Sequence, residues 1–486
     1  MSGRSFVRDS AVYALSQYAS RAMMLARGLA AAAALGPAGF GAWNALVLVL
    51  DYGSYASLGS LYGLDLKLPP AVARGESEGA RASMRGAWGL TLAGGAVFAL
   101  VVVAYLRAGT WLALTGWGWG PPFLMLAAVF AQLALHYHAA TLRAHGDFGA
   151  VSAATTIQAV VGGGIGLATV WKAGVWGLLW GWLAGSLLAL LRMRCSPHRP
   201  PLRPAPPIEG VPLSRAGFAL FAFFMLSLIL RSMDRVALVR FGGNESLGTY
   251  SLGLIAAGMV LYLPEAAAAV LFPRIAASAE GARDPERTRE EVVRAQRALA
   301  ALLPLPVGLG ALWAAPVVLL TLPAFAGGVT GLRILVLGAL LLAAGTLPGY
   351  ALLGLKQGRR LLPPAAAAVL GAVILVFTVA SSAPRATPVA VASALGQGLF
   401  GAVVLLVGAR ELVADPAARR AMIVASWAPT LWAALLVAGL CAAGGESPAA
   451  YVWRSALFVL GYSPALLRFG RGLGLRSMLR TWFSPA

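Results

Sequence analysis

The sequence predicts an all-α membrane protein that crosses the bilayer about 14 times. Apolar residues make up 59% of the 486-residue chain and charged residues only 12%, whereas a soluble domain carries about a quarter charged residues. Apolar stretches of the length that spans hydrocarbon recur along the whole chain. Lys and Arg gather in alternate loops between these stretches, as they do in membrane proteins with a fixed orientation.

The spanning helices are predicted one by one from these stretches. Gly and Pro interrupt many of them, which membrane helices tolerate. The first stretch is longer than the apolar part of a signal peptide, so we interpret it as the first spanning helix. The predicted helices are residues 10–34, 40–62, 84–106, 122–143, 150–171, 174–192, 215–239, 248–272, 298–320, 331–355, 361–381, 387–409, 421–443 and 449–468.

The loop charges test this succession. If the N-terminus is cytoplasmic, the cytoplasmic segments hold 28 of the 38 Lys and Arg residues, and the loops on the other side hold 4. A missed helix would exchange the sides of every later loop, so the bias predicts both the count and cytoplasmic N- and C-termini. The net charge of +20 is then explained by topology and by contact with anionic membrane lipids. Nucleic-acid binding is disfavoured, because no basic soluble domain is present.

A Pro-rich linker after the sixth helix divides the chain. Six helices return the chain to the side from which it started, so a second set of six would begin in the same orientation as the first. Two Gly-rich turns, residues 35–43 and 241–250, each lead through Gly-x-aromatic into a long apolar run, which favours a parallel pseudo-repeat. The predicted parts are an N-lobe with helices one to six (1–195), a cytoplasmic linker (196–213), a C-lobe with helices seven to twelve (214–409), and two further helices with a cytoplasmic tail (410–486).

These motifs resemble a known family. Asp234–Val239 followed by a Gly-rich turn and Leu247–Leu252, together with Leu35–Trp43, are similar to patterns of bacterial polysaccharide and O-antigen flippases. Those proteins belong to the multidrug/oligosaccharidyl-lipid/polysaccharide exporter superfamily. The chain departs from the pattern at Ser57–Ser60, where many relatives carry Asp-x-Gly-Leu, so no role of that Asp is carried over.

The resemblance implies two six-helix lobes around a central cavity, with two additional C-terminal helices. It also implies a polyprenyl-diphosphate-linked oligosaccharide as substrate, translocation across the bacterial inner membrane by alternating access, and polysaccharide polymerase components as partners. A diphosphate and its sugars cannot cross hydrocarbon unaided, so such a cavity would need cations, and the planar fork of Arg suits phosphate.

Charged side chains at bilayer depth are the candidates for the site, because they are costly there and usually face the protein interior. Arg21 and Arg27 of the first helix are predicted to line the cavity; the alternative for Arg21 is a structural pair with Asp51. Spacings of three and four residues put Arg231, Asp234 and Arg235 on one face of the seventh helix. That cluster is predicted to contact substrate, and its alternative role is to anchor the outer end of the helix.

Two carboxylates and a histidine complete the candidates. Asp51, in mid-helix, is either a carboxylate that couples transport to H⁺ or Na⁺ or the counter-ion of a buried Arg. Glu265 follows Pro264, and a carboxylate beside a helix break fits an ion site in a transporter. His136 could face the cavity, but neither it nor His138 has the neighbours that a metal site needs.

Two other kinds of protein compete with the flippase. A cation-coupled multidrug exporter or a peptidoglycan lipid-precursor flippase belongs to the same superfamily, and Arg inside the membrane argues against cationic drugs. A membrane-bound glycosyltransferase or ligase would need a carboxylate-rich site in a sizeable loop, which the sequence lacks. No enzymatic activity and no cofactor are expected beyond the coupling ion.

Overall fold

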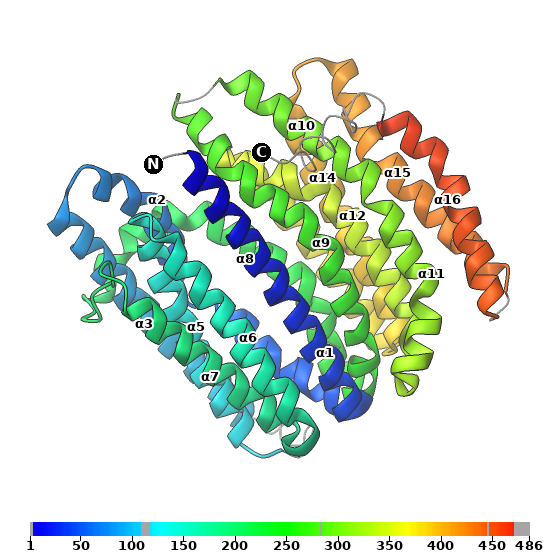
Figure 1. Cartoon of the computed structure of the whole chain (residues 1–486), viewed down its shortest axis with the longest axis horizontal. Coiled ribbons are helices and arrows are strands. Elements are labelled where there is room, and N and C mark those ends of the chain that lie inside the picture. Colours follow the sequence, from blue (N-terminus) through cyan, green and yellow to red (C-terminus); the bar gives the residue numbers. More distant parts are fainter. Residues whose placement is uncertain (1–2, 108–116, 282–283, 445–446, 471–486) are drawn as a thin grey trace. The chain divides into compact units, whose positions relative to one another are not determined.

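The chain folds entirely into helices in the part that the structure describes. This computed structural model describes residues 3–107, 117–281, 284–444 and 447–470, and none of these residues forms a β-strand (Figure 1). The predicted all-α fold is confirmed. By contact clustering the chain divides into two compact units, Met1–Leu228 with Gly243–Gly248 and Ile229–Gly242 with Thr249–Ala486, here called the first and the second unit.

The first unit is a bundle of long helices, of which α6 packs against α7 and α1, and α5 packs against α7. The first part of α8, up to Leu228, also belongs to it. Its elements are α1 (Gly3–Gly53), α2 (Ser60–Ala73), α3 (Ser77–Arg107), α5 (Gly120–Ala144), α6 (Phe148–Ala173), α7 (Val175–Arg194), η1 (Pro207–Gly210) and the start of α8 (Val211–Phe241).

The second unit is centred on α12 and α14, which pack closely against each other. α15 and α16 pack on each other and on α10 and α11. Its elements are the end of α8, α9 (Gly243–Ala279) from Thr249 onward, α10 (Pro285–Leu302), α11 (Pro304–Thr321), η2 (Pro323–Gly328), α12 (Val329–Gly354), α13 (Gly358–Ser382), α14 (Ala386–Leu412), α15 (Pro416–Ala442) and α16 (Pro448–Gly470).

Twelve helical stretches of the described residues are long and apolar enough to cross a membrane. The sequence predicts 14, and two places account for the difference. The first two predicted helices are joined in α1, whose Ser20–Gly53 part counts as one stretch. The fourteenth predicted helix is α16, which is less apolar because it carries Arg454 and several polar residues, and it is not among the twelve.

The chain bends inside α1 at Gly36, which has φ +64° and ψ 178°. A left-handed φ is unfavourable for most residues and open to glycine. The two arms of α1 therefore correspond to two predicted spanning helices that meet at this turn, at the lower end of α1 in Figure 1. The Gly-rich turn that was predicted from the sequence is confirmed at this position.

The two aligned Gly-rich turns contact each other within the first unit. A Cβ atom on Gly41 would lie 1.8 Å from the carbonyl oxygen of Asn244, and one on Gly248 would lie 1.8 Å from the carbonyl oxygen of Pro37. In the alignment Gly41 corresponds to Gly248 and Pro37 to Asn244, so the contact is reciprocal. We call this backbone-to-backbone approach the glycine contact; only residues without a side chain permit it.

The second predicted helix, residues 40–62, is not continuous. The first helix of the structure ends at Gly53, turns follow, and α2 begins at Ser60. Leu58 has φ +51° and Gly59 has φ +84°, which a right-handed helix cannot contain. Ser60 anchors the break, because its Oγ donates to the Ser57 carbonyl at 2.8 Å and lies 3.2 Å from Thr91 Oγ1 on α3.

The Pro-rich linker lies against α3. The amide of Ala205 donates to the Arg85 carbonyl at 3.0 Å, and the Tyr137 hydroxyl donates to the Pro201 carbonyl at 2.9 Å. A Cβ on Gly89 would lie 2.0 Å from the Ala205 carbonyl oxygen, so the linker approaches the α3 backbone closely. The segment is a fixed part of the first unit.

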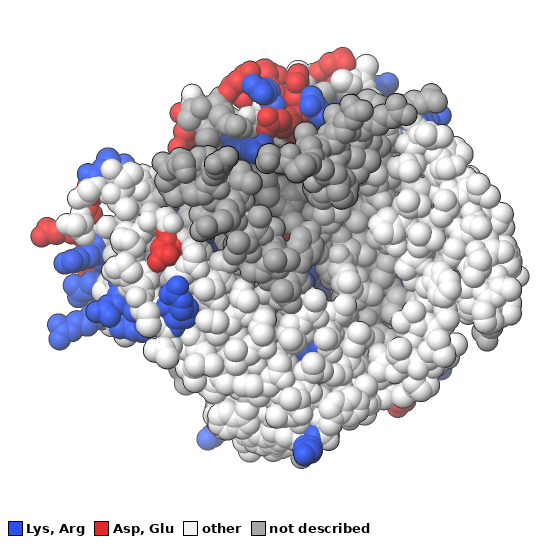
Figure 2. Space-filling model, in the orientation of Figure 1, with Lys and Arg blue, Asp and Glu red and all other residues white. Residues whose placement is uncertain are grey.

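The surface of each unit has the pattern of a membrane protein. Over the first unit, Figure 2 shows charged side chains gathered near α2 and α3 and a broad uncharged area below them. Over the second unit, charges gather at α10, whereas the side formed by α15 and α16 is uncharged. Large apolar side chains are exposed along the long helices, for example Leu100 of α3, Leu370 of α13 and Leu435 of α15. Lipid is the solvent that such surfaces require.

Candidate functional site

Arg27 is a buried cation in the first arm of α1. Only 8% of its surface is exposed. Its guanidinium carbon lies 4.6 Å from the ring centre of Trp182 and 5.8 Å from that of Trp43. Gly166 of α6 makes room for the side chain, since a Cβ there would lie 3.1 Å from Arg27 Cδ.

Aromatic rings stand in for a counter-ion at Arg27. No carboxylate of the described residues lies within ion-pair distance of it, and its buried Nη1 atom has no hydrogen-bond partner there. Ring faces attract a guanidinium, by roughly 2 kcal/mol or more where water is excluded. The rings support the cation without neutralising it, so its charge is available to an anion.

Arg21 and Asp51, the other candidates of α1, lie in its two arms. The Arg21 side chain is exposed and that of Asp51 is half-buried. Each interacts with other groups.

His136, on α5, is exposed. Its Nε2 atom lies 2.9 Å from Nε2 of Gln132, one turn earlier on the same helix. That amide begins a chain of hydrogen bonds that continues to Gln158 on α6 and Ser186 on α7. His138, two residues on, is buried and its Nδ1 lies 2.8 Å from the Ala134 carbonyl oxygen, which is a structural role.

Asp234, at the end of α8, is fully buried in the second unit. Its carboxylate accepts hydrogen bonds from the Tyr250 hydroxyl on α9, from Ser393 Oγ on α14 at 2.7 Å, and from the backbone amide of Arg235 at 2.7 Å. Gln397 Nε2 donates to the same Ser393 hydroxyl at 3.3 Å. The Asp-Arg and Leu-Gly-x-Tyr parts of the sequence motif are therefore joined by a hydrogen bond between Asp234 and Tyr250.

Arg231 and Glu265 are brought together by α8 and α9. Arg231 Nη1 lies 2.8 Å from Glu265 Oε1, and both side chains are partly exposed, at 40% and 33%. Arg235 is half-buried and has an interaction of its own. The predicted substrate and ion-coupling roles of these residues stay predictions.

Several residues of these clusters were not found from the sequence. Neutral amides and hydroxyls are common in membrane helices, so nothing singled out Gln132, Gln158, Ser186 or Ser393. Two further arginines could be singled out from the sequence, because they too fall outside the loops. Arg333 donates from Nε to the Ala311 carbonyl at 3.0 Å, and Arg454 is 4% exposed, with Tyr451 and Trp453 each 5.7 Å from its guanidinium.

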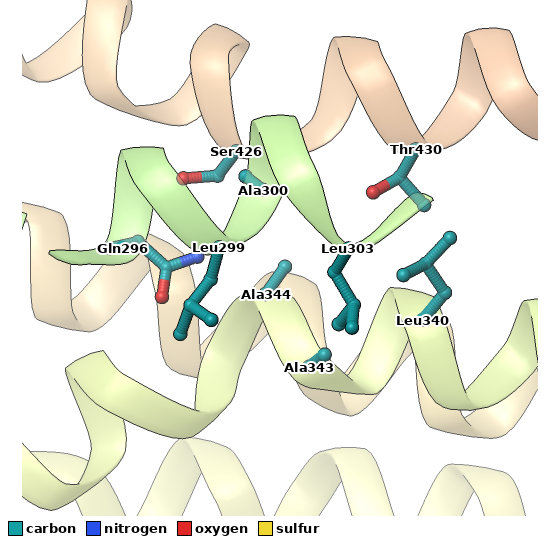
Figure 3. Close-up of a pocket in the computed structure, with 9 residues that line it drawn as sticks. All are labelled: Gln296, Leu299, Ala300, Leu303, Leu340, Ala343, Ala344, Ser426 and Thr430. Atoms are coloured by element: carbon teal, nitrogen blue, oxygen red, sulfur yellow. The ribbon is translucent and has the colours of Figure 1, made fainter. Parts of the chain in front are cut away.

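A small pocket lies inside the second unit, between the end of α10, α12 and α15 (Figure 3). Gln296, Ser426 and Thr430 give it a polar side, and Gln296 Oε1 and Ser426 Oγ have no hydrogen-bond partner among the described residues. It has room for about one water molecule. An oligosaccharide does not fit into it.

The described residues contain no group of three or more His, Cys, Asp or Glu side chains that could hold a metal ion. The clusters that they do contain can bind an anion through Arg27, form neutral hydrogen bonds through the amides near His136, and hold a buried carboxylate at Asp234.

Comparisons with known proteins identify the family and the fold. A sequence model of the family described as "Polysaccharide biosynthesis protein" matches residues 35–324. None of the curated proteins that were compared matches the chain.

Solved structures share the fold. A structure described as the lipid II flippase MurJ in an inward closed conformation has a TM-score of 0.67 at 13% identity, covering 96% of this chain and 99% of that one. An inward-facing multidrug transporter of the MATE family and MOP superfamily has a TM-score of 0.61 at 17% identity, covering 81% and 95%. A MOP superfamily transporter from Pyrococcus furiosus has a TM-score of 0.55 at 17% identity, covering 84% and 95%.

Proposed function

Because the chain belongs to the polysaccharide biosynthesis protein family, we propose that it is a flippase for a polyprenyl-diphosphate-linked oligosaccharide. It moves this precursor of a surface polysaccharide across the bacterial inner membrane by alternating access, without a chemical step. Polymerase components receive the product. The family and the shared MOP transporter fold support this proposal.

The observation that carries the proposal is the charge of Arg27. A cation inside a membrane-spanning helix is costly, and here it lies near two indole rings and, among the described residues, pairs with no carboxylate. Such a group repels cationic drugs and attracts a diphosphate, to which a guanidinium donates two parallel hydrogen bonds. Arg21, six residues earlier on the same arm, adds a second positive charge.

Coupling to an ion gradient is part of the proposal. Asp51 and Glu265 are its candidate carboxylates. Glu265 already pairs with Arg231 at 2.8 Å, so an incoming H⁺ or Na⁺ competes with that arginine. Opening the pair releases Arg231 as a further cation for the substrate.

The second candidate is a flippase for a peptidoglycan lipid precursor. The fold favours it, because the structure described as a lipid II flippase covers nearly the whole of both chains. Its cargo also carries a polyprenyl diphosphate, so Arg27 would serve both functions. The two proposals differ only in the sugars.

Deletion of the gene and complementation test the function. We expect a lipid-linked oligosaccharide to accumulate on the cytoplasmic leaflet of the deletion strain and to disappear when the wild-type gene is restored. Arg27→Ala should reduce translocation at least tenfold, and Arg27→Lys less, because Lys keeps the charge without the planar fork. Arg74→Ala is the matched control, since Arg74 is exposed and pairs only with Glu76.

Each of three other results would contradict the proposal. Accumulation of a peptidoglycan precursor supports the second candidate. Reduced export of a cationic drug, with no lipid-linked sugar accumulating, indicates a multidrug exporter. Full activity of Arg27→Ala removes the anion site from the mechanism.

A further inference from the structure

A continuous chain of neutral hydrogen bonds crosses three helices of the first unit. Gln158 Nε2 on α6 donates to Gln132 Oε1 on α5 at 2.9 Å and to Ser186 Oγ on α7 at 3.0 Å. Gln132 Nε2 lies 2.9 Å from His136 Nε2. We call the side chains of His136, Gln132, Gln158 and Ser186 the amide chain.

The hydrogen bonds of the amide chain fix its orientation. Because Gln132 Oε1 accepts from Gln158, its amide nitrogen faces His136 and must donate. His136 Nε2 therefore accepts, and the neutral imidazole carries its proton on Nδ1. Ser186 is fully buried and anchors the far end, so each amide plane is held in place.

One side of the amide chain stays open. His136 is exposed, and Gln132 and Gln158 are half-buried. His136 Nδ1, the second amide hydrogen of Gln132 and Gln158 Oε1 form no hydrogen bond to another described residue. All three residues lie in helices that qualify as membrane spans, where open polar groups facing lipid are costly. The open side therefore faces water or a ligand.

The chemistry of that side is neutral and mixed. It offers donors at His136 and Gln132 and an acceptor at Gln158, in fixed positions and without a charge. Hydroxyl and acetamido groups both donate and accept, so they match such an array, whereas a phosphate can only accept. A site built from hydrogen-bonding groups also rejects ligands that leave those groups unpaired.

The amide chain shares a helix with the wall of the anion site. Gly166 of α6 lies against Arg27, and Gln158 is eight residues earlier, which is about 12 Å along the helix. A diphosphate at Arg27 and sugars attached to it would thus follow α6 toward Gln158.

We propose that the amide chain is the sugar-binding subsite of this transporter and that it selects for hydroxyl- and acetamido-bearing sugars, while Arg27 holds the diphosphate. The proposal rests on the function proposed above. It assigns substrate specificity to the first unit and to neutral side chains, and it separates recognition of the sugar from recognition of the lipid anchor.

Binding of two probes to the purified full-length protein tests the subsite. One probe is a short polyprenyl diphosphate that carries a single N-acetylhexosamine, and the other is the same polyprenyl diphosphate without sugar. We expect His136→Ala and the double variant Gln132→Leu/Gln158→Leu to weaken binding of the sugar probe at least tenfold. Binding of the sugar-free probe should change less than twofold. Arg27→Ala should weaken both.

Thr156→Val is the matched control on α6. Its hydroxyl bonds only to the Ser152 carbonyl of its own helix, at 3.0 Å, so its loss should leave both affinities unchanged. The sugar-free probe also reports on folding, because a misfolded variant would lose it too; His136→Ala, which removes an exposed side chain, avoids that problem.

Three outcomes overturn the proposal. Equal weakening of both probes by the amide variants shows a structural role for the chain. Unchanged binding of the sugar probe places the sugars elsewhere. If the wild-type protein binds neither probe, the proposed function itself fails, and the subsite fails with it.

Discussion

Single side chains decide what the two units can bind. Arg27 and Asp234 are both buried ions, but their surroundings differ. Arg27 lies between indole rings with an unpaired donor, whereas Asp234 accepts three hydrogen bonds from neutral groups. A buried ion that already has partners is a structural centre, and one without them is available to a ligand.

The Asp234 centre should stabilise the second unit through Tyr250. Tyr250→Phe removes one hydrogen bond to a buried carboxylate, which is worth about 1.5–3 kcal/mol. Asp234→Ala should cost more, since it leaves the hydroxyls of Tyr250 and Ser393 unpaired. Thermal unfolding in detergent measures both, and the double variant should show a coupling energy.

Ser227→Ala serves as the control for this prediction. Ser227 lies on α8, as Asp234 does, and its hydroxyl bonds only to the Phe223 carbonyl, at 2.9 Å. If Tyr250→Phe destabilises the protein no more than Ser227→Ala does, the hydrogen bond to Asp234 is not a stabilising contact.

Sequence alone found the charged residues and missed their neutral partners. Arg27, Asp234 and Glu265 stand out because charge is rare in membrane helices. Gln132 and Gln158 do not stand out. An amide indicates a binding site only when another polar group lies beside it, and here the neighbouring polar groups come from other helices. The ion pair of Arg231 with Glu265 likewise joins side chains of two different helices, α8 and α9.

At the scale of helices, glycine sets how closely backbones approach. The glycine contact joins the turn of α1 to the start of α9, and the two segments use the same positions of an aligned motif. Reciprocity of this kind is what a parallel pseudo-repeat would produce. The alternation of loop charge and the Gly-rich turns were enough to predict that these two hairpins exist.

Filling the glycine contact should disrupt it. Gly41→Ala or Gly248→Ala would place a methyl group 1.8 Å from a carbonyl oxygen, so the turns must separate. We expect either variant to lower the unfolding temperature and the transport rate. The double variant should cost less than the sum of the single ones, because the first substitution already separates the turns.

Gly164→Ala is the control for the glycine contact. Nothing lies within 4 Å of a Cβ at Gly164, and alanine favours the helix by up to about 1 kcal/mol over glycine. Transport by Gly41→Ala and Gly248→Ala at the level of Gly164→Ala would show that the turns move apart without consequence.

The break at residues 54–59 shows where sequence patterns fail for a helix. Leu58 is a good helix former, and nothing in its identity announces φ +51°. The apolar run continues through the break, so hydropathy predicts one helix where the structure has two. Tertiary packing decides the conformation here, through Ser60 and Thr91.

For the whole molecule, the loop charges predict the orientation in the membrane. Cys195 follows α7 and is exposed, directly before the predicted cytoplasmic linker. In intact spheroplasts of a Cys441→Ser variant, we expect Cys195 to react with a membrane-impermeant maleimide only after permeabilisation. A wild-type degree of transport by the variant is the control.

Labelling of Cys195 in intact spheroplasts would contradict the predicted orientation. Such a result would contradict either the cytoplasmic N-terminus or the predicted number of helices up to α7, because these two together set the side on which Cys195 lies. The overall number of spans and the all-helical fold depended on apolar length and loop charge alone, which is why they could be predicted without knowledge of any contact.

The second predicted span has close backbone contacts near both of its ends, with two different helices. Near its start, Gly41 abuts Asn244 in the first turn of α9. At its other end, a Cβ on Gly63 would lie 1.9 Å from the carbonyl oxygen of Leu213 on α8, and one on Gly217 of α8 would lie 2.4 Å from that of Gly59. These contacts hold the span in place near both of its ends. Removing one residue of α1 between Gly41 and Gly53 would rotate the helix on one side of the deletion by about 100° relative to the other side, so this arm should tolerate a change of side chain more readily than a change of length.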